Sequence, residues 1–429
     1  MQRRFSRFAD TVLGEPGIFR LMDDLDAALT GSQKLHMLGG GNPGNVGPVS
    51  EYFRRAFLRI GESADHFARV AGRYDGPAGN TQFRKAFAAS LSAMYGWSLT
   101  ESNVVLTQGS QNAFFLLLNL FSGPFPDGRG RKILFALSPE YIGYENSGLH
   151  ENSLLAVPSK KIPLGDGFFR YTIDIERITQ ALQTGNIGAI CISRPSNPTG
   201  GMLEDDEMKN LSSLARQFDV PLIVDGAYGD PMPGVVYGNG RPYYDDNTIF
   251  VLSLSKTGLP GIRTGIILAP ADVCSVLERI QAVQHLAPGG LGPALVQEGI
   301  ADGSFFKLCK EHLPVFYRER QRLAIDTLFN ELEPDRDVQI HRPDGAFFLW
   351  AVFPRLTIST SELYLDLKKA GVLVVPGSYY YPGLPDDDRL SPEWEGQRSI
   401  RISYSQDLST IQEGLSILCQ VVREKNSRA

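Results

Sequence analysis

A lysine stands between two serines and an arginine in one short segment, which reads Ser253-Leu254-Ser255-Lys256-Thr257-Gly258-Leu259-Pro260-Gly261-Ile262-Arg263. The apolar run Ile249–Leu252 precedes it and is typical of a strand that is buried on both faces. Because glycine and proline interrupt the residues after Lys256, we expect a tight loop there and not a helix. The segment thus predicts an amine, a guanidinium and two hydroxyls at one end of a buried sheet, which is where open α/β sheets bind ligands.

Four further motifs place polar or aromatic side chains directly after predicted strands. Gly109-Ser110-Gln111 opens a helix, so its backbone N–H groups either bind an anion or only begin the helix. Tyr141 offers its ring to the sheet edge or to the core, and Asn197 lies in a turn. Asp225 follows a buried strand, and Tyr228 lies beyond it. A buried carboxylate indicates a partner, because an isolated buried charge costs several kcal/mol.

The elements that position these side chains alternate between strand and helix from about residue 100 onward. This alternation predicts βαβ units and a mostly parallel sheet. After about residue 305 helices mix with short strands, which is typical of a smaller α+β domain. The predicted strands are Asn103–Leu106, Ile133–Leu137, Ala189–Ser193, Pro221–Val224, Ile249–Leu254, Thr264–Leu268, a short one near Val338, Phe347–Val352, Val372–Val375 and Ser399–Ser403. The predicted helices are Gly17–Leu29, Ala113–Leu120, Asp205–Phe218, Leu308–Leu332, Ser361–Ala370 and Thr410–Arg423.

The composition argues against several classes of protein. The chain has 429 residues with 42 basic and 48 acidic side chains, and this net charge of −6 argues against a nucleic-acid or anionic-membrane partner. The four cysteines are widely separated, so we expect buried thiols in a reducing cytosol, and no metal site. The apolar window Ala113–Phe121 is far shorter than the ~20 residues of a membrane span, and charges interrupt Phe5–Leu25 too often for a signal peptide.

A glycine run, Gly39-Gly40-Gly41, invites comparison with nucleotide-binding loops. In such loops a helix must follow, because its N-terminus holds the phosphate. Pro43 and Pro48 prevent that helix, so we expect a loop that lines a cleft.

In their order along the chain, the motifs resemble those of the aspartate-aminotransferase-like superfamily of fold-type-I pyridoxal-phosphate enzymes, nearly from end to end. Within it the chain is most similar to the valine–pyruvate aminotransferases, in the stretches Met37–Pro43, Tyr74–Pro77, Pro139–Tyr144, Leu286–Pro293 and Val375–Gly377. The resemblance implies an α/β fold with a mostly parallel sheet of the seven-stranded type, flanked by helices. It implies a large cofactor-binding domain over residues 71–304. The smaller α+β domain would combine residues 1–70, which include an N-terminal arm, with residues 305–429.

The resemblance also assigns roles around a bound pyridoxal 5'-phosphate. Lys256 would form a Schiff base with the cofactor aldehyde and, once displaced, would shuttle a proton. Asp225 would keep the pyridine nitrogen protonated, which makes the ring an electron sink. Asn197 and Tyr228 would hydrogen-bond the phenolic oxygen, while Tyr141 would stack on the ring.

The remaining predicted contacts concern the phosphate and the substrate. The phosphate would be bound by Ser110, Gln111, Ser253, Ser255, Arg263 and, from a neighbouring subunit, Tyr74, so the resemblance implies a homodimer with shared active sites. The loop from Lys256 to Arg263 is one residue shorter than in many relatives. Arg401 would bind the substrate α-carboxylate as a bidentate fork, and Gly41 would let the substrate approach closely.

The function that the resemblance implies is a cytoplasmic, ping-pong transamination in amino-acid biosynthesis. Valine would give its amino group to the cofactor and leave as 2-oxoisovalerate, and pyruvate would take the group and leave as alanine. The same residues also suit an aminotransferase of different specificity or a C–S β-lyase. A ligand-sensing regulator on this fold is disfavoured, because the roughly 35 residues before the glycine run carry no DNA-binding pattern.

Overall fold

The computed structural model describes residues 35–426 and the single positions 5, 9, 19 and 23. The helix predicted over Gly17–Leu29 falls almost entirely outside them. The chain forms two compact units that are interleaved along the sequence. The first unit comprises Met1–Asn42, Leu118–Leu203 and Tyr317–Ala429, and the second comprises Pro43–Leu117 and Glu204–Phe316. The domain boundaries predicted near residues 71 and 305 stay a prediction.

The second unit contains four short strands whose residues are all buried. They lie in the order β2-β11-β10-β9, with bounds β2 (Val104–Thr107), β9 (Leu222–Asp225), β10 (Thr248–Ser253) and β11 (Gly265–Leu268). β9 and β10 are parallel, whereas β11 runs antiparallel to both of its neighbours. In register, Val251 pairs with Asp225, Ser253 with Gly265, and Gly265 with Thr107. The register therefore places the C-terminal ends of β2, β9 and β10 and the N-terminal end of β11 at the same edge of these four strands.

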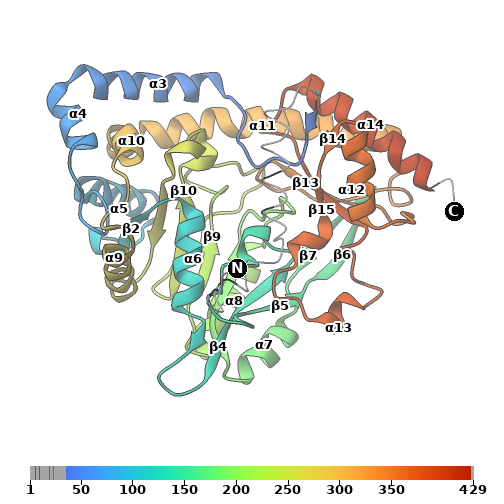
Figure 1. Ribbon diagram of the computed structural model, residues 1–429, viewed down its shortest axis with the longest axis horizontal. Helices are drawn as coiled ribbons and strands as arrows, with labels where there is room; N and C mark the ends of the chain where they lie inside the picture. Colours follow the sequence, from blue (N-terminus) through green and yellow to red (C-terminus); the bar gives the residue numbers. More distant parts are fainter. Residues whose placement is uncertain (1–4, 6–8, 10–18, 20–22, 24–34, 427–429) are drawn as a thin grey trace. The chain divides into compact units, whose positions relative to one another are not determined.

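Helices surround these strands in the second unit. They are α3 (Gly47–Glu62), α4 (Ala64–Ala71), α5 (Thr81–Tyr95), α8 (Asp205–Gln217), α9 (Ala271–His285) and α10 (Leu291–Ala301), while α6 (Ser110–Leu120) and α11 (Ser304–Glu331) continue into the first unit. In Figure 1, α3 runs directly into α4. The sequence defines α5 clearly, because Asn80 caps its N-terminus through the N–H of Phe83 and Gly96 ends it with a φ of 73°.

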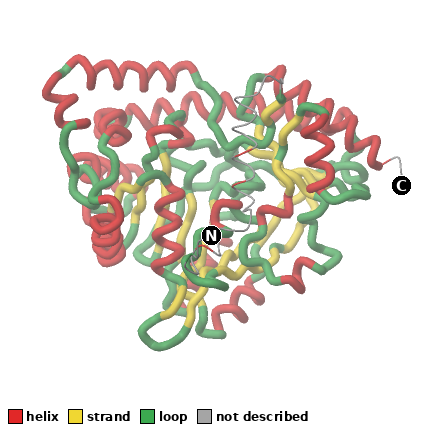
Figure 2. The backbone as a smooth tube through the Cα atoms, in the orientation of Figure 1, coloured by secondary structure: helices red, strands yellow, loops and turns green. Residues whose placement is uncertain are grey.

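The first unit holds a second set of parallel strands and a separate six-stranded sheet. The parallel strands β8 (Ile187–Ser193) and β5 (Leu154–Pro158) flank β4 (Gly130–Ser138), and the short β3 (Gly123–Pro124) is antiparallel to β4. The six-stranded sheet has the order β15-β16-β13-β12-β7-β6, and its strands are yellow in Figure 2, as all strands are. Their bounds are β6 (Lys160–Gly165), β7 (Phe168–Thr172), β12 (Gln339–His341), β13 (Phe348–Val352), β15 (Val375–Pro376) and β16 (Ser399–Ser403).

The remaining elements of the first unit are short or lie near its C-terminus. They are β1 (His36–Met37), α7 (Ile175–Gln183), α12 (Thr360–Lys369), β14 (Val372–Leu373), α13 (Asp386–Arg389) and α14 (Leu408–Asn426). α12 packs beside α14, as Figure 1 shows, and begins with a capping box formed by Ser359 and Glu362. One predicted strand was wrong, because Val372–Val375 is divided between β14, which pairs with β1, and β15, which pairs with β16.

Two further properties concern the cysteines and the hydropathy of the helices. All four cysteines are free and buried, as predicted. Within residues 35–426, no helix has both the length and the apolar character that crossing a membrane would require. Inside each unit the strands are therefore packed as ordinary apolar layers, with polar groups concentrated where the strands end.

Candidate active site

Lys256 directly follows β10 in the second unit. The residues around it form a short 3-10 turn, Ser255–Thr257, in which the backbone N–H of Ser255 donates to Ser253 Oγ at 3.1 Å. The Thr257 hydroxyl donates to the Leu254 carbonyl at 2.6 Å. The amine Nζ of Lys256 lies 5.6 Å from the centre of the Tyr228 ring. Since hydrogen bonds fix the turn, the lysine is rooted in rigid backbone at the end of a buried strand.

Asp225 is the last residue of β9, beside β10. It is 9% exposed, and its Oδ1 accepts a hydrogen bond from the backbone N–H of Ala227 at 2.9 Å. The chain then turns at Gly226, where an added Cβ would lie only 2.5 Å from the ring of Phe250. Tyr228, which is 5% exposed, follows this turn. Because β9 and β10 are parallel, Asp225, Tyr228 and Lys256 lie at the same edge of the strands.

An anion cradle lies between the start of α6 and Arg263. Gly109 has a φ of 87°, and a Cβ at this position would lie 2.4 Å from Nη2 of Arg263. A Cβ on Gly265 would lie 2.7 Å from the backbone nitrogen of Ser110. Only glycine therefore lets the guanidinium and β11 approach the first turn of α6. Backbone N–H groups of a helix N-terminus beside a guanidinium make a site that suits a phosphate group.

The other predicted residues of the second unit differ in exposure. Ser253 is fully buried and Ser255 is 5% exposed, so their hydroxyls belong to the interior of the lysine turn. Gln111 follows Ser110 in the first turn of α6 and is half-buried. Tyr74, in the loop before α5, is 83% exposed. An exposed tyrosine is free to meet another molecule, but its role in the phosphate site stays a prediction.

Arg401 is the centre of a buried cluster in the first unit, which we call the arginine cluster and which comprises Gly39, Asn197, Phe348, Tyr380 and Arg401. In register, Arg401 of β16 pairs with Trp350 of β13 and with Val375 of β15. Its Nη1 donates to Asn197 Oδ1 at 2.9 Å and its Nη2 to the Gly39 carbonyl at 2.6 Å. Its Cζ lies 4.3 Å from the Phe348 ring centre and 5.3 Å from that of Tyr380.

The charge of Arg401 is unbalanced. The side chain is 2% exposed, its Nε has no hydrogen-bond partner, and no carboxylate of residues 35–426 forms an ion pair with it. A buried guanidinium normally pairs with an anion, since burying an unpaired charge costs several kcal/mol. The arginine cluster is therefore suited to bind an anionic ligand, and the planar guanidinium matches a carboxylate best.

Glu140, a residue that the sequence analysis missed, connects the segment of Tyr141 to the strand before Asn197 and to Tyr380 of the arginine cluster. Glu140 is fully buried, and its carboxylate accepts hydrogen bonds from the Ser193 N–H at 2.9 Å and from the Ser193 hydroxyl at 2.5 Å. The backbone N–H of Glu140 donates to the Tyr380 carbonyl at 2.8 Å. Glu140 thus fixes the segment of Tyr141 against the strand that leads to Asn197. The available signal was an acidic residue close to the end of a buried strand, since Glu140 lies two residues beyond β4 and Asp225 ends β9.

Two other residues predicted to contact substrate or cofactor, Gly41 and Asn197, lie in or next to the arginine cluster. Gly41 follows the Gly39 carbonyl that Arg401 binds and is only half-buried. The amide oxygen of Asn197 accepts a hydrogen bond from Arg401, and the predicted contact of Asn197 with the cofactor stays a prediction. This leaves the amide NH2 as the end of Asn197 that is suited to donate to a phenolic oxygen.

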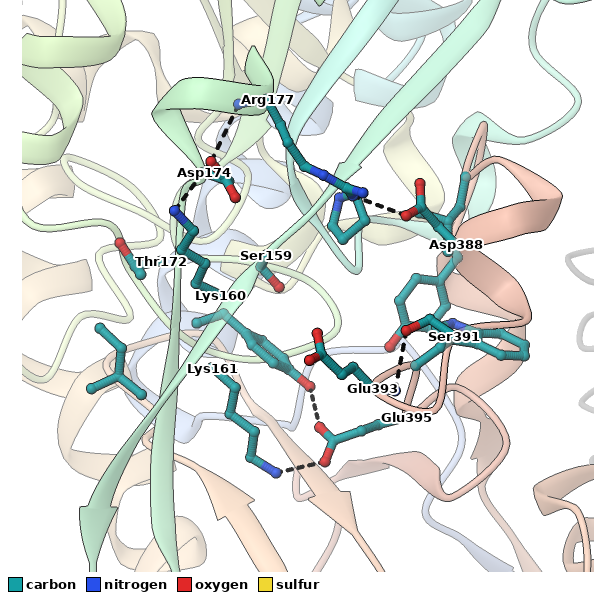
Figure 3. A pocket seen from close by; sticks show the side chains of 16 residues that line it. Ser159, Lys160, Lys161, Thr172, Asp174, Arg177, Asp388, Ser391, Glu393 and Glu395 are labelled. Carbon is teal, nitrogen blue, oxygen red and sulfur yellow. Dashed lines mark hydrogen bonds and ion pairs between the residues drawn. The ribbon is translucent and has the colours of Figure 1, made fainter. Parts of the chain in front are cut away.

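A separate pocket of about 900 Å³ occurs in the first unit, and Figure 3 shows its wall. None of the predicted site residues lines it. Its charges neutralise one another, as in the pairs Lys161–Glu395 at 2.6 Å and Arg177–Asp388 at 2.9 Å. Because these ion pairs are satisfied within the wall, neither pair offers an unpaired charge for a ligand. Lys256 and Arg401 remain the candidate site residues.

The strands and their polar edges define an α/β enzyme of the aminotransferase type, and comparison with known proteins agrees. The description "aminotransferase class I and II" applies to the family model that matches residues 62–418, and the chain belongs to this family. It is 38% identical to the valine–pyruvate aminotransferase of Escherichia coli (strain K12) over 418 residues, which cover 97% of this chain and 98% of that relative.

Solved structures extend the likeness to three dimensions. A putative amino-acid aminotransferase from Psychrobacter arcticum 273-4 has a TM-score of 0.95 and 39% identity, and the match covers 100% of both chains. The valine–pyruvate aminotransferase from Salmonella typhimurium LT2 has a TM-score of 0.85 and 37% identity, covering 96% of this chain and 99% of that one. The predicted fold class is thereby confirmed.

Proposed function

We propose that this protein is a pyridoxal-phosphate-dependent aminotransferase that exchanges an amino group between valine and pyruvate. The observation that carries the proposal is the buried Arg401, whose guanidinium has an unpartnered Nε and no carboxylate partner in residues 35–426. A substrate α-carboxylate supplies the missing anion. The relatives named as valine–pyruvate aminotransferases support valine and pyruvate as the substrates.

The residues of the second unit fit the cofactor. Lys256 offers the amine that binds its aldehyde, Asp225 offers a carboxylate for its ring nitrogen, and the cradle at Gly109 and Arg263 suits its phosphate. When bound, pyridoxal phosphate supplies an electron sink that stabilises negative charge on the substrate Cα. The buried Asp225 is able to hold a proton on the ring nitrogen because ionised carboxylates are strong acceptors.

The proton transfers then belong to Lys256. Its Nζ would take the proton from the substrate Cα and hold it for return during the transfer, while bound pyridoxal phosphate would supply the electron sink. Arg401 orients the substrate by its carboxylate, so that Cα is presented in one direction. Tyr228 and the amide NH2 of Asn197 would hydrogen-bond the phenolic oxygen of the bound cofactor, and Tyr141 would pack against its ring. Pyruvate reverses the sequence and leaves as alanine, because both half-reactions use the same residues.

The proposal extends to the assembly and the location of the enzyme. We propose a homodimer in which the exposed Tyr74 reaches the phosphate of the neighbouring subunit. The four buried free thiols support a reducing cytoplasm. An aminotransferase of other specificity stays open, since an apolar pocket separates valine from 2-aminobutyrate or alanine by only ~1–3 kcal/mol.

A coupled assay tests the function directly. The holoenzyme is incubated with valine and pyruvate, and 2-oxoisovalerate, alanine and ammonia are measured together. We expect equal amounts of 2-oxoisovalerate and alanine, and no ammonia. Repeating the assay with a panel of amino donors ranks their kcat/KM. Ammonia release from cysteine conjugates without alanine formation would instead support the C–S β-lyase.

A further inference from the structure

Two buried donors in the arginine cluster have no hydrogen-bond partner among the residues that the structure describes. They are Nε of Arg401 and the hydroxyl of Tyr380. The two side chains are 2% and 0% exposed. An unpaired buried donor costs about 1–3 kcal/mol, and native proteins keep few of them. Two such donors in one cluster indicate a ligand group that accepts from both.

The Tyr380 ring is held in place on several sides. Its centre lies 5.3 Å from Cζ of Arg401 and 5.7 Å from the Trp350 ring, which meets it edge-on at 89°. The carbonyl of Tyr380 accepts the N–H of Glu140 at 2.8 Å. Since ring and backbone are both fixed, the hydroxyl occupies one position, as a recognition group requires.

The hydroxyl is a donor throughout the physiological pH range. Burial raises the pKa of Tyr380, which keeps the phenol protonated, while the positive charge of Arg401 acts in the opposite direction. Tyr141 also interacts electrostatically with Tyr380, and Tyr141 is the residue predicted to stack on the cofactor. A protonated phenol next to an unbalanced guanidinium is complementary to an anion, and a water-excluded setting strengthens such hydrogen bonds.

We propose that the Tyr380 hydroxyl donates a hydrogen bond to the α-carboxylate of the substrate, beside Arg401. This inference rests on the proposed function. A carboxylate offers two oxygens and about four acceptor sites, so it is able to accept from the guanidinium and from the phenol at once. Every amino-acid and 2-oxo-acid substrate carries this group. Tyr380 therefore selects the class of substrate and not its side chain.

Ligand binding by the holoenzyme tests the role without any turnover. The probes are 3-methylbutanoate and its uncharged analogue 3-methylbutanamide, and calorimetric titration gives the Kd of each. In Tyr380→Phe we expect the Kd of the carboxylate to rise about tenfold and that of the amide to change less than about twofold. The matched control is Tyr379→Phe, which removes the hydroxyl of the half-buried neighbour and is expected to leave both Kd values unchanged.

Three results would overturn the role of Tyr380: an unchanged Kd for 3-methylbutanoate in Tyr380→Phe, an equal rise for both probes, or the same rise in Tyr379→Phe. Because phenylalanine removes only an unpartnered hydroxyl, the variant is expected to fold, and its thermal unfolding midpoint checks this. The titration also remains decisive if the proposed function fails. Wild-type enzyme that binds 3-methylbutanoate but transfers no amino group from valine to pyruvate would refute that function alone.

Discussion

Two arginines that we assign to anionic groups are held in opposite ways. Arg401 in the first unit is 2% exposed, donates to Asn197 and Gly39, and contacts two aromatic rings. Arg263 in the second unit is exposed, has a φ of 52°, and donates to the Pro260 carbonyl at 3.3 Å. A fixed, buried guanidinium selects a ligand by geometry, whereas an exposed one mainly supplies charge.

The two arginines also differ in how the chain builds their surroundings. Arg263 lies within one short segment with Lys256, Ser253 and Ser255. Arg401 meets Gly39 across 362 positions and Asn197 across 204 positions of the sequence. Local backbone therefore determines the lysine turn, while the arginine cluster exists only after the first unit has folded. Substitutions should separate loss of chemistry in the turn from loss of selectivity in the cluster.

The largest effect is expected for Lys256→Ala. Without the amine, neither cofactor attachment nor proton transfer at Cα is possible, so kcat should fall by roughly a thousandfold or more. The absorption band of lysine-bound cofactor should disappear, while circular dichroism should show a folded protein. The control Lys161→Ala changes a lysine whose Nζ pairs with Glu395 in the separate pocket, and should keep most of the activity. Substantial turnover in Lys256→Ala would end the assignment.

The next effect is expected for Arg401→Lys, which keeps the charge and removes the fork. A lysine cannot reproduce the geometry of the bonds to Asn197 and Gly39 together with a bidentate carboxylate. We expect kcat/KM to fall about a hundredfold, by a similar factor for every amino donor. A panel of donors of different size measures this. A loss limited to valine would place Arg401 in the side-chain pocket and would remove its role as the general carboxylate site.

The sequence predicted the surroundings of Lys256 and Arg263 better than those of Arg401. The strand expected over Ile249–Leu254 is β10, and Asp225, expected just after a strand, is the last residue of β9. Such predictions succeed because buried strands and glycine-rich turns are local features. Ser399–Ser403 was also predicted with its observed bounds, which places Arg401 on a strand.

The sequence could not predict the partners of Arg401. Alternation along a strand gives the face of a residue, but not which distant segments pack on that face. The contact with Gly39, the bracing by Glu140 and the unpartnered hydroxyl of Tyr380 all depend on tertiary structure. The division of Val372–Val375 between two sheets has the same origin, because periodicity does not show which strand becomes the partner.

A smaller effect is expected for Gly109→Ala, which tests the exposed arginine. The new Cβ would lie 2.4 Å from Nη2 of Arg263 at a φ of 87°, so the guanidinium must move and the backbone is strained. We expect the Kd of pyridoxal phosphate to rise about tenfold, since one hydrogen bond to a charged group is weakened. Fluorescence titration of the apoenzyme measures this Kd.

Two controls separate the causes of that change. Gly128→Ala introduces backbone strain at a φ of 80° in open space, and Gly261→Ala adds a Cβ in open space without a positive φ. Both should keep the affinity for the cofactor. If Gly128→Ala weakened it equally, strain and not displacement of Arg263 would be the cause. Unchanged affinity in Gly109→Ala would show that the position of this exposed arginine is unimportant.

The smallest effect at neutral pH concerns His341, which supports the Asn197 side of the arginine cluster. It is 3% exposed, its Nε2 accepts the N–H of Tyr171 at 2.9 Å, and a Cβ on Gly201 would lie 2.2 Å from its ring. Gly201 closes the turn around Asn197, because its carbonyl accepts the N–H of Ser196 at 2.8 Å. Protonation of His341 would break the bond to Tyr171 and disturb this turn.

Burial lowers the pKa of His341 from 6.5 to about 3, so the folded protein keeps the ring neutral while the unfolded chain takes up a proton below pH 6.5. The contribution of His341 is complete above pH 6.5 and is lost as the pH falls towards 3, by at most about 1.4 kcal/mol per pH unit. Urea unfolding at pH 7.5 and 5.5 should show this dependence, and His341→Gln, whose amide can still accept from Tyr171, should show less of it. Equal pH dependence in the two proteins would mean that other groups, and not His341, couple the stability of this region to pH.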